Sequence, residues 1–327
     1  MSRRRSESRV AAFFLATIFG FGLLALFPAN EAAANHGPGA SGGGSATISG
    51  ETLKPGSFEL SLREDYTQFQ HFTEPEAVAR AQQGGDFDAL HRSLLTTLSL
   101  DVGLFEDFQV GASVGYFAGN DFVAADDQGN VGTVDPHGLT DLVVTAKYRL
   151  LSGQPGNLAL LAGVEFPTGR DDVRLSNGEL LSPTDQPGSG AWDFPFGLGY
   201  SRYLTERITV DASTMYTLRT EHDGFKSGDR FDAGVALACR LTDSIKSFPQ
   251  TSLFAEVNLV ALAKDREDGV ADGNSGSQTL YFTPGVRCRF TPNAALTLAP
   301  SLPLLEHLNG NQGRVEYKVA ATLSFSF

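Results

Sequence analysis

Apolar and polar residues alternate along most of the chain beyond residue 56, with the two-residue period of a β-strand whose faces meet different surroundings. The C-terminal stretch 315–327 shows the alternation well, since Val315 and Tyr317 share one face while Glu316 and Lys318 share the other. No stretch beyond residue 56 keeps a helical period over any length. The pattern therefore predicts an all-β protein.

Twelve segments with this alternation follow one another, and each is expected to form one strand. They are residues 57–69, 91–104, 108–117, 139–151, 158–166, 191–204, 207–220, 229–241, 251–263, 279–290, 294–304 and 315–327. Gaps after the even-numbered segments are short, whereas gaps after the odd-numbered segments are mostly longer and rich in Gly, Asp, Asn and Ser. This arrangement is typical of a transmembrane antiparallel up-and-down β-barrel of about 12 strands, with short periplasmic turns and long extracellular loops.

A soluble β-sandwich is the alternative, because its strands also alternate. The length of the segments and the aromatic residues near their ends, such as Tyr148 and Trp192, favour the barrel, which needs aromatic girdles at both membrane interfaces. Pro284, Pro300 and Pro303 fall inside expected strands, where a missing N–H weakens pairing. The segments 57–69, 251–263 and 294–304 are the weakest of the expected strands.

The C-terminal strand resembles the assembly signal of outer-membrane barrels. Its apolar face ends on an aromatic residue and comprises Tyr317, Val319, Leu323, Phe325 and Phe327. From this resemblance we expect the barrel assembly machinery, outer-membrane lipid and lipopolysaccharide to be partners, and the cell outer membrane to be the location.

The first 56 residues do not follow the strand pattern. Four arginines precede the apolar run 10–27, and an A-x-A pattern at 32–34 follows it, so residues 1–34 are expected to be a signal peptide cleaved before Asn35. A retained membrane anchor is the alternative. Residues 35–56 are rich in Gly and Ser and are expected to be a flexible periplasmic tether. Residues 57–327 then form the barrel.

Charge and cysteine content exclude two classes of protein. The formal net charge of −13 makes nucleic acid an unsuitable partner, because binding a polyanion needs clustered Lys and Arg. Cys239 and Cys288 are the only thiols. Alternation places Arg240, Arg287 and Arg289 in the lumen and both thiols toward lipid, on strands two positions apart, about 9.5 Å. That separation exceeds what a disulfide tolerates, so two free thiols are expected.

Candidate catalytic and metal-binding residues are few. The six His residues have no metal-ligand spacing, so neither a metal site nor another cofactor is expected. The acidic stretches 126–130 and 265–274 lack the calcium-loop register, which favours solvated loops over calcium sites. His91 and Ser93 are the one His and Ser pair on a common strand, and we interpret their proximity as coincidental. The chain is therefore not expected to be an enzyme, with a barrel hydrolase as a minor alternative.

Charged residues of both signs fall on the face expected to line the lumen. The six expected to set selectivity are Asp141, Lys147, Arg149, Arg240, Arg287 and Arg289. The basic members cluster toward the short turns, while acids dominate the opposite loops, so a basic periplasmic mouth and an acidic outer mouth are expected. A lumen closed by salt bridges that only stabilise the barrel is an equally supported alternative.

One block of residues resembles a known family. Its letters are Gly138, Asp141, Lys147, Tyr148, Arg149, Pro167, Thr168 and Gly169. The block is similar to that of the MetA-pathway phenol-degradation family of outer-membrane barrels, although Thr140 replaces a glycine of the family pattern and Glu165-Phe166 precede Pro167. The resemblance implies uptake of aromatic or hydrophobic compounds.

The pattern and the resemblance together predict a channel for passive passage of small solutes, which include aromatic or hydrophobic compounds. No motif for an energy source or cofactor is present in the sequence, so flux would follow a gradient. The alternative is a plugged structural or adhesive surface protein whose acidic loops bind ions. A narrow barrel of twelve strands leaves both open, because side chains can fill its interior.

Overall fold

The computed structural model describes residues 44–243 and 247–327. The expected signal peptide at 1–34 and residues 35–43 of the expected tether lie outside the described residues.

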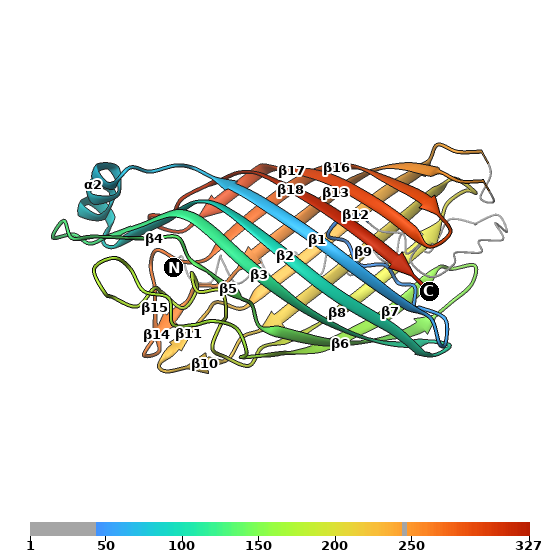
Figure 1. The fold of residues 1–327 in the computed structure, drawn as a ribbon, viewed down its shortest axis with the longest axis horizontal. Helices are drawn as coiled ribbons and strands as arrows, with labels where there is room; N and C mark the ends of the chain where they lie inside the picture. Colours follow the sequence, from blue (N-terminus) through green and yellow to red (C-terminus); the bar gives the residue numbers. More distant parts are fainter. Residues whose placement is uncertain (1–43, 244–246) are drawn as a thin grey trace, which may run out of the picture.

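Twelve long antiparallel strands close into one barrel, in which β1 pairs with both β2 and β18 (Figure 1). The strands are β1 Phe58–Phe69, β2 Phe87–Phe105, β3 Phe108–Ala125, β6 Leu142–Leu151, β7 Asn157–Phe166, β8 Phe194–Tyr203, β9 Ile208–Leu218, β12 Arg230–Arg240, β13 Gln250–Leu262, β16 Ser277–Thr291, β17 Ala294–Leu308 and β18 Val315–Ser326. Closure leaves no free edge among these strands, as a membrane-spanning sheet requires.

Each of the twelve expected segments overlaps one of these strands, so the predicted fold class is confirmed. The largest differences are in β2, which begins at Phe87, and in β3, which continues to Ala125. These extensions pair with each other, from Phe87 opposite Ala125 through Leu90 opposite Phe122. They form a ribbon that projects past the neighbouring strands.

The two faces of the strands follow the alternation. On β12, Val235 and Leu237 are exposed on the outer surface, whereas Ala236 between them is fully buried inside. Cys239 has the same parity as Leu237 and is exposed, and neither Cys239 nor Cys288 forms a disulfide. The prediction of two free thiols is confirmed.

The prolines interrupt the ladder without ending the strands. Pairing between β16 and β17 runs up to Phe282 opposite Leu302 and resumes at Val286 opposite Leu298. Pro284 lies in this gap, where its missing N–H is tolerated. The hydroxyl oxygens of Thr283 and Ser301, 2.7 Å apart, bridge the strands there instead.

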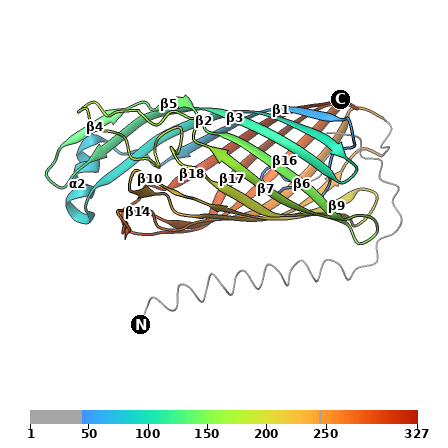
Figure 2. The same ribbon diagram turned by 90° about the horizontal axis from the view of Figure 1, so that it is seen from below.

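The two ends of the barrel differ, as Figures 1 and 2 show. We call the end with the short turns the turn end, and the opposite end, with the long connections, the loop end. The loop end carries the helix α2 Glu74–Gly84 and the short strands β4 Val131–Val134, β5 His137–Leu139, β10 Glu221–His222, β11 Phe225–Lys226, β14 Arg266–Glu267 and β15 Val270–Ala271. In an outer-membrane barrel the loop end is extracellular and the turn end is periplasmic.

Helix α2 was missed by the sequence pattern. It begins at a capping box in which the backbone N–H and the hydroxyl of Thr73 both donate to the Glu76 carboxylate, at 2.8 and 2.7 Å. Its small residues Ala77 and Ala81 pack on the β2–β3 ribbon around Phe87. Among the described residues, no helix is long and apolar enough to cross a membrane.

The barrel closes where its two ends in sequence meet. Phe58 and Phe327 exchange backbone hydrogen bonds of 3.0 and 2.8 Å, and their rings stack at 4.9 Å. Tyr317 and Phe325 are exposed on the outer surface of β18 beside this seam. The apolar face proposed as an assembly signal therefore points away from the lumen.

Candidate functional site

The lumen is crowded with polar side chains at the turn end and in the middle of the barrel. Glu256 on β13 and Asp211 on β9 have no exposed surface, and Lys147 on β6 retains 8%. Their neighbours along each strand alternate between outside and inside, so the strand period carries these charges inward. A buried charge is costly unless it is paired or hydrogen-bonded, so each of them requires partners.

The main partner is the chain segment 44–56, which lies inside the barrel rather than below it. The Glu256 carboxylate accepts hydrogen bonds from the backbone N–H groups of Ser45 at 2.7 Å and Thr47 at 2.5 Å, and from the Thr47 hydroxyl. A carboxylate that accepts several donors is stabilised in its charged form. Glu256 thus anchors one end of the segment.

The same segment then follows the wall toward the turn end. The N–H of Ile48 donates to the Ser213 hydroxyl at 3.0 Å, and the N–H of Gly50 donates to the Ser201 hydroxyl at 2.8 Å. Near the β2–β3 turn, the N–H of Leu53 donates to the Gln109 side chain at 2.9 Å. We call residues 44–56 the luminal segment.

Glycines in the wall leave room for the luminal segment. A Cβ atom at Gly199 on β8 would lie 2.7 Å from the carbonyl oxygen of Ser49, and a Cβ at Gly103 on β2 would overlap the carbonyl of Lys54. The prediction of a flexible tether is therefore wrong for residues 44–56. The Gly and Ser residues of this segment allow it to lie close to the wall and to form hydrogen bonds with it, and they do not make it flexible.

Acids surround the two predicted lumen cations that lie deepest. Lys147 interacts electrostatically with Asp101, Glu51, Asp211 and Glu59. Arg287 interacts with three acids, namely Asp211, Glu59 and Glu256. It also donates to the Gly44 carbonyl at 3.4 Å and to the Thr297 hydroxyl at 3.1 Å. This part of the lumen is consequently a charge-compensated network.

The other predicted cations lie at the rim of the turn end, although Arg149 still interacts electrostatically with Glu51, and Arg289 with Glu59, of that network. Arg149 forms an ion pair with Asp107 at 2.7 Å. Arg240 donates to the backbone carbonyl of Glu206 at 3.0 Å, and Arg289 donates to that of Pro292 at 2.9 Å. Each of these side chains thus stabilises a short turn. The six predicted selectivity residues do not form one ring around the lumen.

Asp141 lies toward the loop end, away from the other predicted selectivity residues, and accepts hydrogen bonds from a loop. One of its carboxylate oxygens accepts from the Gly169 N–H at 2.7 Å, and the other accepts from the N–H and the hydroxyl of Ser189, both at 2.7 Å. The side chain is buried. Asp141 therefore fastens both ends of the loop 167–193 to strand β6.

Other residues of the family-like block also attach the loop 167–193 to the start of β6. The Leu142 N–H donates to the Thr168 hydroxyl at 3.0 Å. Gly169 packs so closely that a Cβ would lie 2.7 Å from the Cα of Gly188 and 2.8 Å from the carbonyl carbon of Thr140. Only glycine fits there without displacing backbone. Tyr148, by contrast, is exposed on the outer surface.

The fastened loop folds back over the β2–β3 ribbon. Val173, Leu175 and Leu181 of the loop are buried against Phe122 of β3. This packing brings residues 183–186 toward the inner wall of the barrel.

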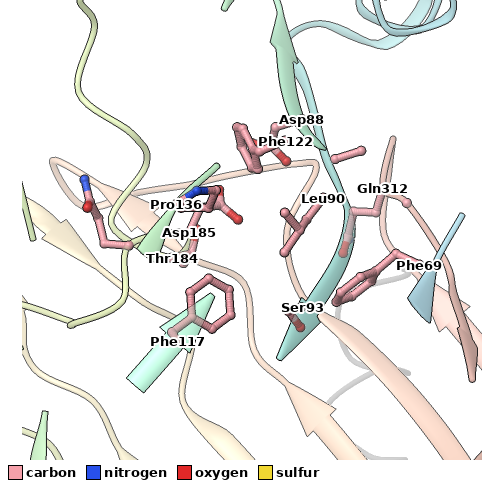
Figure 3. A pocket seen from close by; sticks show the side chains of 13 residues that line it. Phe69, Asp88, Leu90, Ser93, Phe117, Phe122, Pro136, Thr184, Asp185 and Gln312 are labelled. Atoms are coloured by element: carbon pink, nitrogen blue, oxygen red, sulfur yellow. The ribbon is translucent and has the colours of Figure 1, made fainter. Parts of the chain in front are cut away.

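A cavity of about 330 Å³ lies between the folded loop and the wall, and we call it the vestibule pocket (Figure 3). Its lining includes Phe69, Asp88, Phe117, Phe122, Asp185 and Gln312. Three phenyl rings and two carboxylates therefore meet at the loop end of the barrel. The sequence pattern did not find this pocket, because its residues come from β1, β2, β3 and three loops that are distant in sequence.

His91 and Ser93 are not assembled as a catalytic pair. His91 lies 3.3 Å from the Asp121 carboxylate through Nδ1, and its ring lies 4.3 Å from that of His71. Ser93 is buried and lines the vestibule pocket, which His91 does not. In the described part of the chain, no group of three or more acidic, His or Cys side chains is placed to hold a metal ion.

Solved structures provide a comparison for the fold. The COG4313 outer membrane channel from Pseudomonas putida F1 aligns with 85% of this chain and 97% of its own chain, at 16% identity and a TM-score of 0.62. A TodX monoaromatic hydrocarbon channel mutant aligns at 12% identity, 84% and 90% coverage and a TM-score of 0.47. The NanC porin aligns at 10% identity, 81% and 98% coverage and a TM-score of 0.44. No curated protein matches the chain.

A family model matches most of the chain. The model of the family described as "Putative MetA-pathway of phenol degradation" matches residues 35–300. The match covers the luminal segment, the junction around Asp141 and all but the last strands of the barrel. This protein therefore belongs to the MetA-pathway phenol-degradation family.

Proposed function

We propose that this protein is an outer-membrane channel through which small solutes, including aromatic or hydrophobic compounds, pass down a concentration gradient. The observation that carries the proposal is a closed barrel with a polar, charged interior, in which hydrogen bonds hold the luminal segment against the wall. Because these bonds can break, the segment can narrow the lumen without blocking it permanently. Family membership and the channel fold of the Pseudomonas putida neighbour support the same function.

The proposal includes the route by which the protein reaches the membrane. Residues 1–34 act as a cleaved signal peptide, and the outward face of β18, which includes Phe325 and Phe327, is recognised by the barrel assembly machinery. Outer-membrane lipid and lipopolysaccharide then surround the exposed apolar belt. We also infer that the protein is not an enzyme, since His91 contacts Asp121 and His71 rather than Ser93.

A plugged structural or adhesive surface protein remains the second candidate. The luminal segment and the compensated charges around Lys147 and Arg287 favour it, because both occupy the space that a solute would use.

Single-channel conductance in planar bilayers separates the two candidates. The sample is the refolded mature chain 35–327. The matched variant lacks residues 35–50 and therefore lacks Ser45 and Thr47, which donate to Glu256. A channel is expected to conduct in discrete steps, with larger steps in the variant. If neither protein conducts while both are inserted and heat-modifiable, the plugged surface protein replaces the channel.

Ion selectivity in a salt gradient tests the predicted lumen residues in the same experiment. Arg287→Ala removes a cation among acids of the network, so we expect a shift toward cation preference. Arg289→Ala at the rim of the turn end is expected to cause a smaller shift, because its side chain faces the Pro292 carbonyl. Equal shifts would contradict the distinction between network and rim.

A further inference from the structure

The vestibule pocket has the dimensions of a small-molecule site. Its volume of about 330 Å³ is at the lower end of the range for ligand pockets, roughly 300 to 1,000 Å³. This volume suits a compound with one ring. The pocket lies at the loop end of the barrel, since the β2–β3 ribbon and the loop 167–193 both line it, and a solute from outside would arrive there first.

The pocket has walls of two kinds. Phe69, Phe117 and Phe122 supply aromatic surface from β1 and β3, and Asp88 and Asp185 supply carboxylates from β2 and the folded loop. An aromatic face attracts a cation through its quadrupole, and the attraction grows when the cation is desolvated. A carboxylate attracts the same ligand by charge.

No basic side chain neutralises the two carboxylates. Within the described residues, neither Asp88 nor Asp185 has a side-chain hydrogen bond or an ion pair. The charged groups that interact with Asp185 are Asp88 and Asp265, and those that interact with Asp88 include Asp86 and Asp272. All of these groups are acids, so negative charge accumulates around the cavity.

The titration of Asp185 reflects this environment. Burial raises the pKa of Asp185 well above its ordinary value, and the nearby carboxylates of Asp88 and Asp265 raise it further. Asp185 lies in the loop beyond the strands, and no His lines the pocket. A bound cation would offset the repulsion among these acids.

The donor set suits an organic cation better than a metal ion. A hard divalent cation such as Ca²⁺ takes six to eight oxygen ligands, whereas the pocket offers two carboxylates beside three phenyl rings. The part of the chain that the structure describes contains no group of three side chains placed to hold a metal.

We propose that the vestibule pocket binds a small organic cation, in which an ammonium group is joined to an aromatic or compact apolar body, as that compound enters the barrel. The inference rests on the proposed channel function and specifies which solutes the channel receives. The ammonium group lies between Asp88 and Asp185, and the apolar body packs on Phe117 and its aromatic neighbours.

Calorimetric titration of the mature chain in detergent tests the proposal with three probes. Benzyltrimethylammonium carries both features, tetramethylammonium carries only the charge, and benzyl alcohol carries only the ring. We expect benzyltrimethylammonium to bind at least roughly ten-fold more tightly than either of the others. Equal affinity for benzyl alcohol would replace the proposal with a neutral aromatic site, and the absence of binding would overturn it.

Variants distinguish binding in the vestibule pocket from attraction of the probe to surface charge in general. Asp88→Asn and Asp185→Asn are each expected to weaken benzyltrimethylammonium binding roughly ten-fold, because a charge-assisted contact is lost. Asp127→Asn removes an exposed carboxylate of the same end and is expected to change nothing. Phe117→Leu keeps the charges and is expected to weaken binding roughly three-fold. Unchanged affinity in both Asn variants, with heat-modifiability retained, would overturn the proposal.

The pH dependence gives a further readout, since a quaternary ammonium group does not titrate. As the pH falls through the raised pKa of Asp185, the carboxyl becomes neutral and affinity decreases. The decrease should begin at a higher pH than for an ordinary Asp. It should be smaller in Asp185→Asn but not absent, because burial and neighbouring acids also raise the pKa of Asp88, to about 6. Binding without conductance would refute the proposed channel and leave the pocket, whereas conductance without binding would refute only the pocket.

Discussion

The two halves of the barrel interior differ in how their charged side chains are paired. At the turn end and mid-barrel, Lys147 and Arg287 lie among acids, and Glu256 accepts donors from the luminal segment. At the loop end, Asp88 and Asp185 line a cavity beside phenyl rings without a basic partner among the described residues. In the first half, charged side chains are compensated by other groups of the protein. In the second half, the two carboxylates are available to a bound cation.

This difference has a physical consequence for how each half behaves. A buried carboxylate that has all its donors holds its surroundings in one arrangement, and removing the donors costs several kcal/mol. A carboxylate pair without a cation is instead destabilised by its own repulsion until a cation arrives. We therefore expect the turn-end half of the lumen to be rigid and the loop-end half to be the part that binds a cation.

The largest expected effect comes from breaking the anchor of the luminal segment. Glu256→Gln keeps the shape of the side chain but removes the charge that accepts from Ser45 and Thr47. Hydrogen bonds to a charged group contribute about 1.5–3 kcal/mol, so amide exchange at 45–47 should accelerate at least roughly ten-fold. Hydrogen exchange read by mass spectrometry measures this directly.

The control for this variant is Glu206→Gln, which removes the same charge from an exposed turn. It should leave exchange at 45–47 unchanged. If both variants behave alike, the segment is held by backbone fit to the wall glycines, such as Gly199, and not by the Glu256 charge.

A smaller but still large effect is expected where the loop end is fastened to the barrel. Asp141→Ala leaves the partly buried N–H groups of Gly169 and Ser189 without their acceptor. The loop should lose about 3 kcal/mol of local stability, and trypsin should then cleave after Arg174. The vestibule pocket should lose its ligand in the same variant, because Asp185 is carried by this loop.

Asp172→Ala is the matched control for Asp141→Ala. It removes an exposed carboxylate of the same loop, whose ion pair with Arg170 at 2.8 Å is a surface contact. Surface pairs contribute about 0–1 kcal/mol. Cleavage as fast as in Asp141→Ala would mean that the junction does not depend on the buried carboxylate.

The sequence predicted the walls of the barrel well because their signal is local. Alternation such as that around Val235, Ala236 and Leu237 decides strand, face and span without knowledge of any other strand. It also placed Lys147 and Arg287 inside. The free state of Cys239 and Cys288 followed from the same parity.

The interior arrangement could not be predicted in this way, since it depends on contacts distant in sequence. Glu256 and Thr47 are separated by 209 positions, and the Gly-rich composition of the segment indicated flexibility when read alone. Asp141 was assigned to the lumen by parity although its partners are Gly169 and Ser189. Helix α2 did carry a local signal, because a Thr73–Glu76 capping box precedes Ala77, yet one short helix is weak against a strand pattern.

The smallest predicted effect concerns acids of the loop end that, unlike the pocket pair, have their own donors. The backbone N–H of Thr73, followed by its hydroxyl, lowers the pKa of Glu76 at the start of α2. A lowered folded-state pKa means that the charged form stabilises the helix. This contribution is complete above the ordinary carboxyl value of 4.5 and is lost as the pH falls through the lower folded-state value.

Thr73→Ala removes the hydroxyl donor and keeps the backbone donor, so the pKa of Glu76 should rise only part of the way toward its ordinary value. Carboxyl carbon shifts in an NMR titration measure that change. Thr133→Ala at the same end, where the native hydroxyl lies near Ser176 instead, should leave Glu76 unchanged. A titration of Glu76 unaltered by Thr73→Ala would show that the hydroxyl contributes nothing and that the backbone N–H of residue 73 alone lowers the pKa of Glu76. Only this backbone donor would then distinguish Glu76 from Asp88 and Asp185.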